Sequence, residues 1–404
     1  MVGPSNARRE KENRPLRISL DIRPLQARSR YQGIGVYCQN LLKALARMDG
    51  EETLLLVHNR RSAPPSDLPR SPRFTLWPVW RPYDIGQRFL PLLDPVWTPF
   101  DLFRARPDVH HVISIHSACL WRPCPVVLTI PDVIPLVFPD QYLQSGMKHR
   151  LLYALARRTD HVVTLSEYSR RDIHRLLNIP LERITVTPAA VDPSFRPLDD
   201  PAESERVVRR YGVVPPYVLY VGGFTVRDPR KRVLLLLEAY QVLRKRGFER
   251  YQLVLAGKEG PYSDLLKAQM NERGWSAGVL FTDYVADADL PHLYNSASCF
   301  VFPSVYEGFG LPPLEAISCG TPTIAYRNSS LPEVLGEGAI LLDREGPAEL
   351  AEAMEAVLTR SDLAQELREK GLAQARKFTW EGCAARTLEA YRSCLRQRRS
   401  QFQG

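Results

Sequence analysis

Short apolar segments alternate with stretches of helical periodicity along nearly the whole chain, and this alternation limits the fold more than any other feature. Short apolar runs suit strands buried on both faces, which occur in parallel sheets covered by helices on both sides. In the first half of the chain the strand candidates are 16–22, 53–58, 110–116, 125–130 and 161–165. The pattern predicts an α/β protein built on parallel sheets.

One segment interrupts the alternation. Residues 188–204 read PAAVDPSFRPLDDPAES, a stretch rich in proline and acidic residues and without periodicity, which predicts a linker between domains. After it the alternation resumes, with strands expected at 217–221, 251–257 and 298–302 and a helix at about 233–245. We therefore expect two Rossmann-like domains that face each other across a cleft, with ligands bound beyond the carboxyl ends of the strands.

The composition of the 404 residues is that of a soluble globular protein, with 44% hydrophobic and 25% charged residues. No apolar run is long enough for a transmembrane helix, and the charged first residues lack the apolar core of a secretory signal. The seven cysteines are scattered, which favours free thiols in a reducing compartment. We expect a cytoplasmic protein.

The formal charge of +9 favours an anionic partner, either a phosphorylated substrate or the anionic face of a membrane. Apart from basic residues at both termini, the cations do not gather in one block studded with aromatic residues. No nucleic acid partner is therefore expected.

The stretch SVYEGFGLPPLEAISCGTP, residues 304–322, carries the main candidate chemistry. It follows the strand candidate 298–302, so it leaves the carboxyl edge of the second sheet. Pro312 and Pro313 suit the first turn of a helix, where a missing N–H costs nothing. Glu307 then lies on the loop, and Glu315 lies in the early helix.

This arrangement favours a nucleotide sugar. The free amides and the positive dipole end of the helix attract a diphosphate, and Gly308 and Gly310 let the backbone approach it closely. Ionised carboxylates accept hydrogen bonds from vicinal diols, so one glutamate would hold a sugar and the other a ribose. The alternative is that Glu307 and Glu315 are solvated acids and that the glycines only form turns.

The same stretch resembles the E-x7-E signature of glycosyltransferase family 4, whose members are retaining enzymes of the GT-B fold. YEGFGLPPLEAISCGTP is especially similar to the mannosyltransferase-type members, and the resemblance extends from about residue 18 to residue 391. It implies that Glu307 and the amides of Phe309, Gly310 and Leu311 hold the donor sugar and its phosphate. It further implies that Glu315 binds the ribose.

The residue pattern and the resemblance together set the expected domains. A disordered leader, 1–14, would precede an acceptor domain, 15–195, which a C-terminal helix at 380–400 completes. The donor domain would occupy 205–379.

A second motif, YVGGFTVRDPRKRVLLLLEAY, places cations between a glycine turn at Gly223 and a helix. Cations are poorly placed at the positive end of a helix dipole unless they serve an anion, such as a diphosphate leaving group. The resemblance matches Lys231 to the family's diphosphate lysine and Arg230 to its neighbour. Extra residues up to Arg227 precede the match, and Arg232 replaces the usual asparagine, so it stays open which arginine reaches the phosphate.

In the first half, Gly33 and Gly35 in RYQGIGVYCQNLL resemble the family's glycine loop, which faces the donor diphosphate. Plain turn formation is the alternative. Relatives commonly carry His-Asp where this chain has Pro131 and Asp132. Asp132 would bind the acceptor or form a turn.

Two further residues are candidates in the same half of the chain. His116, expected at the end of a strand, would take the place of the missing histidine, although a lone strand histidine is more often an ordinary core residue. Ser166 matches the family's serine before the next helix, and it would also serve as an N-cap.

Aromatic residues gather among leucines from residue 77 to residue 103. They could form a lip for a lipid-linked acceptor at a membrane surface, but we expect most of these rings to pack inside. The residues are Trp77, Trp80, Tyr83, Phe89, Trp97, Phe100 and Phe103.

The sequence thus predicts a retaining hexosyltransferase of polysaccharide biosynthesis. It would move a hexose, with mannose from GDP-mannose preferred, to a hydroxyl of a saccharide or lipid-linked acceptor. No cofactor is expected, and no metal, because no aspartate pair of the D-x-D type stands beside a strand. The alternatives are a glucosyltransferase using UDP- or ADP-glucose, including the sucrose- or trehalose-forming type, and a non-catalytic nucleotide-sugar-binding protein. A peripheral contact with the inner face of the membrane is included in the prediction.

Overall fold

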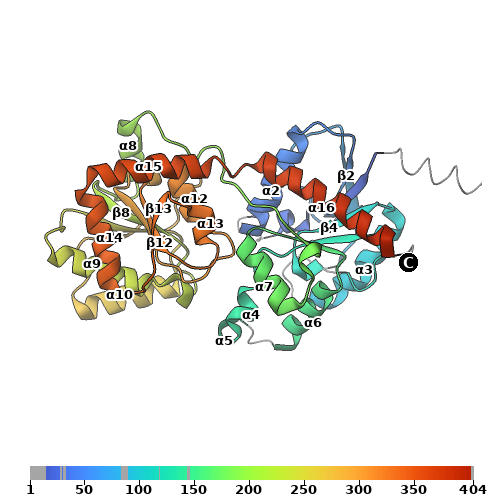
Figure 1. Ribbon diagram of the computed structural model, residues 1–404, viewed down its shortest axis with the longest axis horizontal. Coiled ribbons are helices and arrows are strands. Elements are labelled where there is room, and N and C mark those ends of the chain that lie inside the picture. The colour runs from blue at the N-terminus through green and yellow to red at the C-terminus, as the bar shows by residue number, and fades with distance from the viewer. Residues whose placement is uncertain are drawn as a thin grey trace, which may run out of the picture. The chain divides into compact units, whose positions relative to one another are not determined.

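Two parallel sheets, one in each of two units, organise the described part of the chain (Figure 1). The computed structural model describes residues 15–27, 30, 33–82, 90–117, 119–142 and 146–401. The first unit comprises the described residues before Ala189 together with those from Trp380 onward, and the second comprises Ala189–Thr379. The expected leader, 1–14, and the rings of Tyr83 and Phe89 lie outside the described residues.

The sheet of the first unit has seven strands in the order β3-β2-β1-β4-β5-β6-β7, and all neighbours are parallel. The order reverses at β1 and β4, because the chain first adds strands on one side of β1 and then on the other. The strands are β1 Arg17–Asp21, β2 Thr53–Asn59, β3 Phe74–Val79, β4 Val109–Val112, β5 Val126–Thr129, β6 His161–Thr164 and β7 Ile184–Val186.

Helices cover both faces of this sheet. Side chains of α3, α6 and α7 pack in one buried cluster with alternate residues of β4 to β6. On the other face α16 lies beside α2 and runs over β5 to β7 (Figure 1). The helices are η1 Arg23–Gln26, α2 Gly33–Arg47, α3 Leu90–Ala105, η3 Ile115–Ser117, α4 Ile134–Val137, α5 Pro139–Tyr142, α6 Gly146–Arg157, α7 Glu167–Leu177, η4 Leu181–Arg183 and α16 Trp380–Gln401.

The sheet of the second unit has the order β10-β9-β8-β11-β12-β13, which reverses between β8 and β11. Its strands are β8 Tyr217–Val221, β9 Gln252–Ala256, β10 Val279–Phe281, β11 Cys299–Phe302, β12 Thr323–Tyr326 and β13 Ala339–Leu342. Its helices are α8 Pro201–Arg209, η5 Pro229–Lys231, α9 Val233–Lys245, α10 Pro261–Arg273, α11 Leu290–Ser296, α12 Leu311–Ser318, α13 Leu331–Leu335, α14 Pro347–Thr359 and α15 Ser361–Ala375.

Three local predictions were wrong. The predicted strand 110–116 ends at Val112, and His116 lies in the single turn η3. The predicted linker ends early, because Asp200 accepts a hydrogen bond from the Glu203 amide and thereby caps α8. The first turn of α2 contains Gly33 and Gly35, which were expected in a loop.

The expectation that most aromatic rings between residues 77 and 103 pack inside was also wrong for the described residues. Trp80, Trp97, Phe100 and Phe103 are all exposed. On α3 the inward positions include Asp94 and Thr98 beside Leu102, and the aromatic rings of this helix lie on its outer side.

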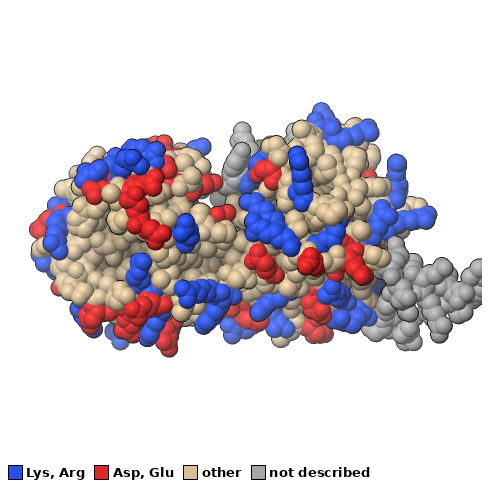
Figure 2. Space-filling model, turned by 90° about the horizontal axis from the view of Figure 1, so that it is seen from above, with Lys and Arg blue, Asp and Glu red and all other residues tan. Residues whose placement is uncertain are grey.

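The seven cysteines are free and buried, as the scattered positions predicted. Within the described ranges, no helix is both long enough and apolar enough to cross a membrane. On the face drawn in Figure 2, basic and acidic side chains are interspersed and form no single basic block.

Candidate active site

The two motifs meet at the point where the strand order of the second sheet reverses. β8 and β11 are neighbours, and the loops that follow them leave the same carboxyl edge. Open parallel sheets bind ligands at this kind of position. The backbone joins the two loops directly, since the Val305 amide donates to the Arg230 carbonyl at 2.9 Å.

Lys231 and Glu307 form an ion pair at this edge. Lys231 Nζ donates to Glu307 Oε1 at 2.6 Å, and the Ser304 hydroxyl donates to the same oxygen at 2.5 Å. The side chains of Lys231 and Glu307 are 25% and 12% exposed, so both remain within reach of a ligand. Lys231 Nζ also lies 5.0 Å from the ring centre of Phe302. The lysine is therefore held in place by a carboxylate and an aromatic face while it retains donors for an anion.

The guanidinium of Arg230 is bound by other residues of the protein. Its guanidinium makes a two-pronged contact with Asp228, at 3.1 and 2.5 Å, and donates to the Tyr306 carbonyl at 2.8 Å. The residue is 8% exposed. These contacts fasten the loop that carries Glu307 to η5, so Arg230 is a positioning residue here.

The loop from Glu307 to Leu311 presents backbone amides. Ser330 donates to the carbonyls of Glu307 and Phe309 at 3.0 and 2.9 Å, which holds the backbone of this loop in place. In the described part of the chain the amides of Phe309, Gly310 and Leu311 donate to no protein acceptor. Because prolines follow at the next two positions of α12, these amides are the ones left for an anion.

Gly310 has a conformation that an L-residue rarely adopts. Its φ is +100°, and a Cβ there would lie 2.8 Å from the side chain of Leu331. The glycine is thus required by backbone geometry at the start of α12.

Glu315 lies on α12 and is half-buried. Tyr294 Oη donates to its Oε2 at 2.8 Å. Burial raises the pKa of Glu315 to about 7; the tyrosine hydrogen bond lowers it in part, and nearby Asp287 raises it further. The carboxyl therefore changes its protonation state near neutral pH.

The other cations of this motif lie differently. Arg227 is exposed. Arg232 pairs with Glu345 at 3.0 Å and has a left-handed backbone, with φ 48° and ψ 33°. Asparagine tolerates that conformation better than arginine does, so Arg232 is strained here. Gly223 is exposed just beyond β8, with open space where a Cβ would be.

The candidates of the first unit occupy separate places. Gly33 is exposed with open space beside it, whereas Gly35 is buried in the same helical turn. Asp132 Oδ1 accepts from the Ile134 amide at 3.0 Å, as a turn-forming residue does. Ser166 is the N-cap of α7, accepting from the Ser169 amide at 3.0 Å.

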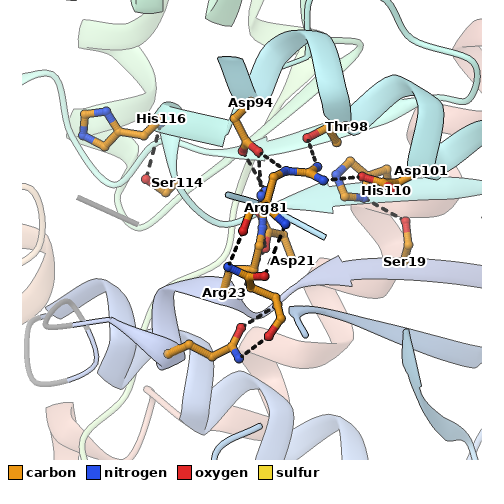
Figure 3. A network of polar contacts seen from close by, with 12 residues as sticks. Ser19, Asp21, Arg23, Arg81, Asp94, Thr98, Asp101, His110, Ser114 and His116 are labelled. Atoms are coloured by element: carbon orange, nitrogen blue, oxygen red, sulfur yellow. Dashed lines mark hydrogen bonds and ion pairs between the residues drawn. The ribbon is translucent and has the colours of Figure 1, made fainter. Parts of the chain in front are cut away.

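His116 is half-buried in η3, and its amide donates to the Ser114 hydroxyl at 3.4 Å. Figure 3 shows its ring pointing away from the buried charged network of Asp94 and Arg81.

Sequence reasoning missed several residues that shape the site. Ser304 bonds Glu307, Ser329 accepts from the Glu307 amide at 2.9 Å, and Ser330 bonds the loop carbonyls. Tyr294 and Asp228 hold Glu315 and Arg230. The two serines at 329 and 330 follow β12, the neighbour of β11, so the rule of adjacent strand ends could have found them.

Within the part of the chain that is described, no group of three or more metal-ligating side chains is placed to hold an ion. The arrangement instead offers a lysine, a set of amides and two carboxylates in one region. Such a set can bind a diphosphate with hydroxyl-bearing groups on both sides.

Two family models match most of the chain. Residues 205–374 match the model described as glycosyl transferases group 1, and this range contains both loops of the site. Residues 31–195 match the model of glycosyltransferase family 4.

The O-antigen chain mannosyltransferase B of Escherichia coli is 37% identical over 274 residues, which cover 66% of this chain and 70% of that protein. The serotype-specific mannosyltransferase WbdA of Escherichia coli is 30% identical over 305 residues, or 72% of this chain. The chain spans only 37% of that longer relative.

Among solved structures, sucrose-phosphate synthase from Thermosynechococcus elongatus superposes with a TM-score of 0.72 at 20% identity. The match covers 93% of this chain and 98% of the other. This likeness shows the GT-B fold.

Proposed function

The chain belongs to glycosyltransferase family 4 of the GT-B fold and is a hexosyltransferase, and we propose that it transfers mannose from GDP-mannose. The transfer proceeds with retention of configuration, to a hydroxyl of a saccharide or lipid-linked acceptor. The names of its relatives, which are mannosyltransferases of O-antigen chains and serotypes, support mannose and a growing polysaccharide as the acceptor.

The observation that carries the proposal is the ion pair of Lys231 with Glu307, where the strand order of the second sheet reverses. Lys231 has three N–H donors, and Glu307 occupies one of them. The others, with the amides of Phe309, Gly310 and Leu311, receive the diphosphate. Glu307 then borders the sugar, and Glu315 accepts hydrogen bonds from the ribose hydroxyls.

The chemistry needs positive charge at the leaving group. The bond between the anomeric carbon and the phosphate oxygen breaks, and a bond from that carbon to the acceptor oxygen forms on the same face of the sugar. The acceptor's proton passes to the departing phosphate oxygen. Lys231 and the amides stabilise the charge that develops on the diphosphate, so the reaction uses neither a metal nor a cofactor.

Donor preference is tested by thermal shift with GDP-mannose, UDP-glucose and ADP-glucose, because a ligand that binds only the folded state raises its stability. Release of nucleoside diphosphate in the presence of a mannan-type acceptor then measures turnover. We expect GDP-mannose to give the largest shift and to be turned over. A larger shift with UDP- or ADP-glucose would replace mannose by glucose, and a shift without turnover of any donor would favour a binding protein.

Lys231→Ala is the informative variant, and it should lower turnover at least about a hundredfold. Lys267→Ala is its matched control, because Lys267 also pairs with a glutamate in the same unit but lies on α10 and is 44% exposed. Equal turnover of the two variants would refute the assigned role of Lys231.

We also propose that the protein works in the cytoplasm and touches the inner face of the membrane, where lipid-linked acceptors are found.

A further inference from the structure

Helix α3 buries a charged and a hydroxyl side chain on its inner face. Asp94, Thr98 and Leu102 follow one another at helical spacing and are 0%, 3% and 2% exposed. A surface helix normally buries an apolar stripe and shows polar residues to solvent. The inner stripe of α3 instead contains a charged and a hydroxyl side chain, Asp94 and Thr98, beside the apolar Leu102.

Two buried arginines hold this stripe (Figure 3). Arg23, at the start of η1, donates to both carboxylate oxygens of Asp94, at 2.6 and 2.7 Å. Arg81 donates to Asp94 at 2.8 Å and to the Thr98 hydroxyl at 3.1 Å, and it pairs with Asp101 at 2.7 Å. Burial by itself raises the pKa of Asp94, but the two guanidinium groups outweigh it and hold that pKa well below its usual range. The orientation of α3 is therefore fixed by charge pairing.

The outer face of α3 is apolar as a consequence. Phe100 and Phe103 are 63% and 61% exposed, and the remaining exposed apolar residues of this helix are Leu93, Val96 and Trp97. Exposed apolar patches of this kind mark docking sites for an apolar partner. Nearby Trp80 packs its ring against Trp97, with centroids 5.8 Å apart.

The exposed apolar residues of α3 lie close in the fold to a segment, Leu120 to Arg122, that leads to a basic cavity. The Leu120 amide donates to the Pro95 carbonyl of α3 at 3.0 Å, and both Leu120 and Trp121 are more than half exposed. The next residue, Arg122, lines a cavity of about 260 Å³. The other charged residues of its lining are Arg157, Arg158, Asp160, Arg183 and Arg398.

The cavity carries an excess of positive charge. Its one carboxylate, Asp160, is already paired with Arg122 at 2.9 Å. Arg398 Nη1 is buried and has no hydrogen-bond acceptor within the described residues, and its ion pair with Asp160 Oδ2 is long, at 4.0 Å. A bound phosphate would supply that acceptor and balance the arginines.

We propose that the outer face of α3, with Leu120 and Trp121, docks the protein on an anionic lipid bilayer, and that the arginine cavity receives a lipid phosphate. The charges favour a bilayer over a second copy of the chain, because the carboxylates of α3 are turned inward and paired, leaving apolar residues bordered by arginines. Aromatic side chains with flanking basic residues suit the headgroup boundary of such a membrane. This inference rests on the membrane contact proposed above and assigns it to named residues.

The test is flotation of the full-length protein with vesicles of phosphatidylcholine alone or mixed with phosphatidylglycerol. Wild-type protein should bind the mixed vesicles more tightly, with a blue shift of tryptophan fluorescence. The double variant Phe100→Ser with Phe103→Ser should weaken binding to mixed vesicles about tenfold or more. Arg158→Gln should weaken it about fivefold, as expected for one basic residue near an anionic surface, and should leave binding to phosphatidylcholine unchanged.

The control for the double variant is Leu265→Ser with Tyr284→Ser, which removes apolar side chains that are 43% and 60% exposed in the second unit. It should bind as wild type does. Equal binding by the control and the α3 variant would overturn the proposal. So would vesicle-independent self-association that the α3 variant abolishes, which would identify a second copy as the occupant.

Turnover with a water-soluble acceptor keeps this test separate from that of the transferase activity. The α3 variant should retain it. Vesicle binding without turnover would support the docking surface and refute the proposed reaction. Turnover without vesicle binding would support the reaction and refute the docking surface.

Discussion

Replacing Glu315 by glutamine should change how both stability and nucleotide binding respond to pH. Burial raises the pKa of this carboxyl from 4.5 to about 7 in the folded protein. Between these values the folded state holds more protons than the unfolded state, so the free energy of unfolding falls as pH rises. A shift of this size corresponds to about 3 kcal/mol of stability, which is present below about pH 4.5 and lost by about pH 7.

Glu315→Gln keeps an acceptor for the Tyr294 hydroxyl but cannot ionise. The stability of the variant relative to wild type should therefore grow by about 3 kcal/mol between about pH 5 and pH 8, as measured by urea unfolding. The affinity of wild type for GDP should rise about tenfold per pH unit below pH 7, because the ribose hydroxyls need the ionised form, whereas that of the variant should stay flat.

Glu352→Gln is the matched control, since this carboxylate is 67% exposed in the same unit. It should follow the wild-type pH dependence. If Glu315→Gln and wild type show the same pH dependence of unfolding, the buried-carboxyl argument is wrong.

Three further substitutions test the backbone and charge arguments. Arg232→Asn should stabilise the protein by about 0.5–1 kcal/mol and raise Tm by about 2 °C in calorimetry, because asparagine accepts the left-handed backbone and the lost ion pair is exposed; a lower Tm would contradict this. Gly310→Ala should lower the free energy of unfolding by about 1–2 kcal/mol and weaken GDP binding in calorimetric titration, because φ is +100° and the side chain of Leu331 fills the space for a Cβ. Unchanged affinity for GDP would show that the amides of this loop do not bind the nucleotide. Asp94→Ala should cost about 3–5 kcal/mol in urea unfolding, because it leaves the charges of Arg23 and Arg81 buried with less compensation; a loss under about 1 kcal/mol would mean that the network contributes little.

The sequence predicted the elements that are buried and regular. The helix expected at about 233–245 is α9, Val233–Lys245, and the strand expected at 217–221 is β8, Tyr217–Val221, because both carry strong apolar patterns. β3 was not predicted, since it is an edge strand in which only Val79 is buried. An edge strand lacks the apolar run that identifies a central one.

The meeting of the two candidate loops could be predicted from the sequence, but their side-chain contacts could not. Lys231 and Glu307 are 76 positions apart, and the rule of strand ends brought their loops together correctly. Arg230 pairs with Asp228, whereas the next residue, Lys231, pairs with Glu307. These partners depend on the directions of the two side chains, which the sequence does not specify.

The inverted orientation of α3 was missed for a related reason. We expected most aromatic rings of this segment to pack inside, and only the partners of Asp94, which lie 71 and 13 positions away at Arg23 and Arg81, show why the rings face outward. Such long-range charge pairing overrides the local pattern.

The central claim is that one sugar nucleotide is held at both ends by carboxylates and at its middle by Lys231 and backbone amides. A crystal structure of the protein with GDP-mannose tests it most directly. The account predicts that Glu315 lies within hydrogen-bond distance of the ribose hydroxyls, Glu307 beside the mannose, and Lys231 Nζ about 3 Å from a diphosphate oxygen. A nucleotide bound with its diphosphate away from Lys231, or with either carboxylate directed away from the ligand, would contradict it.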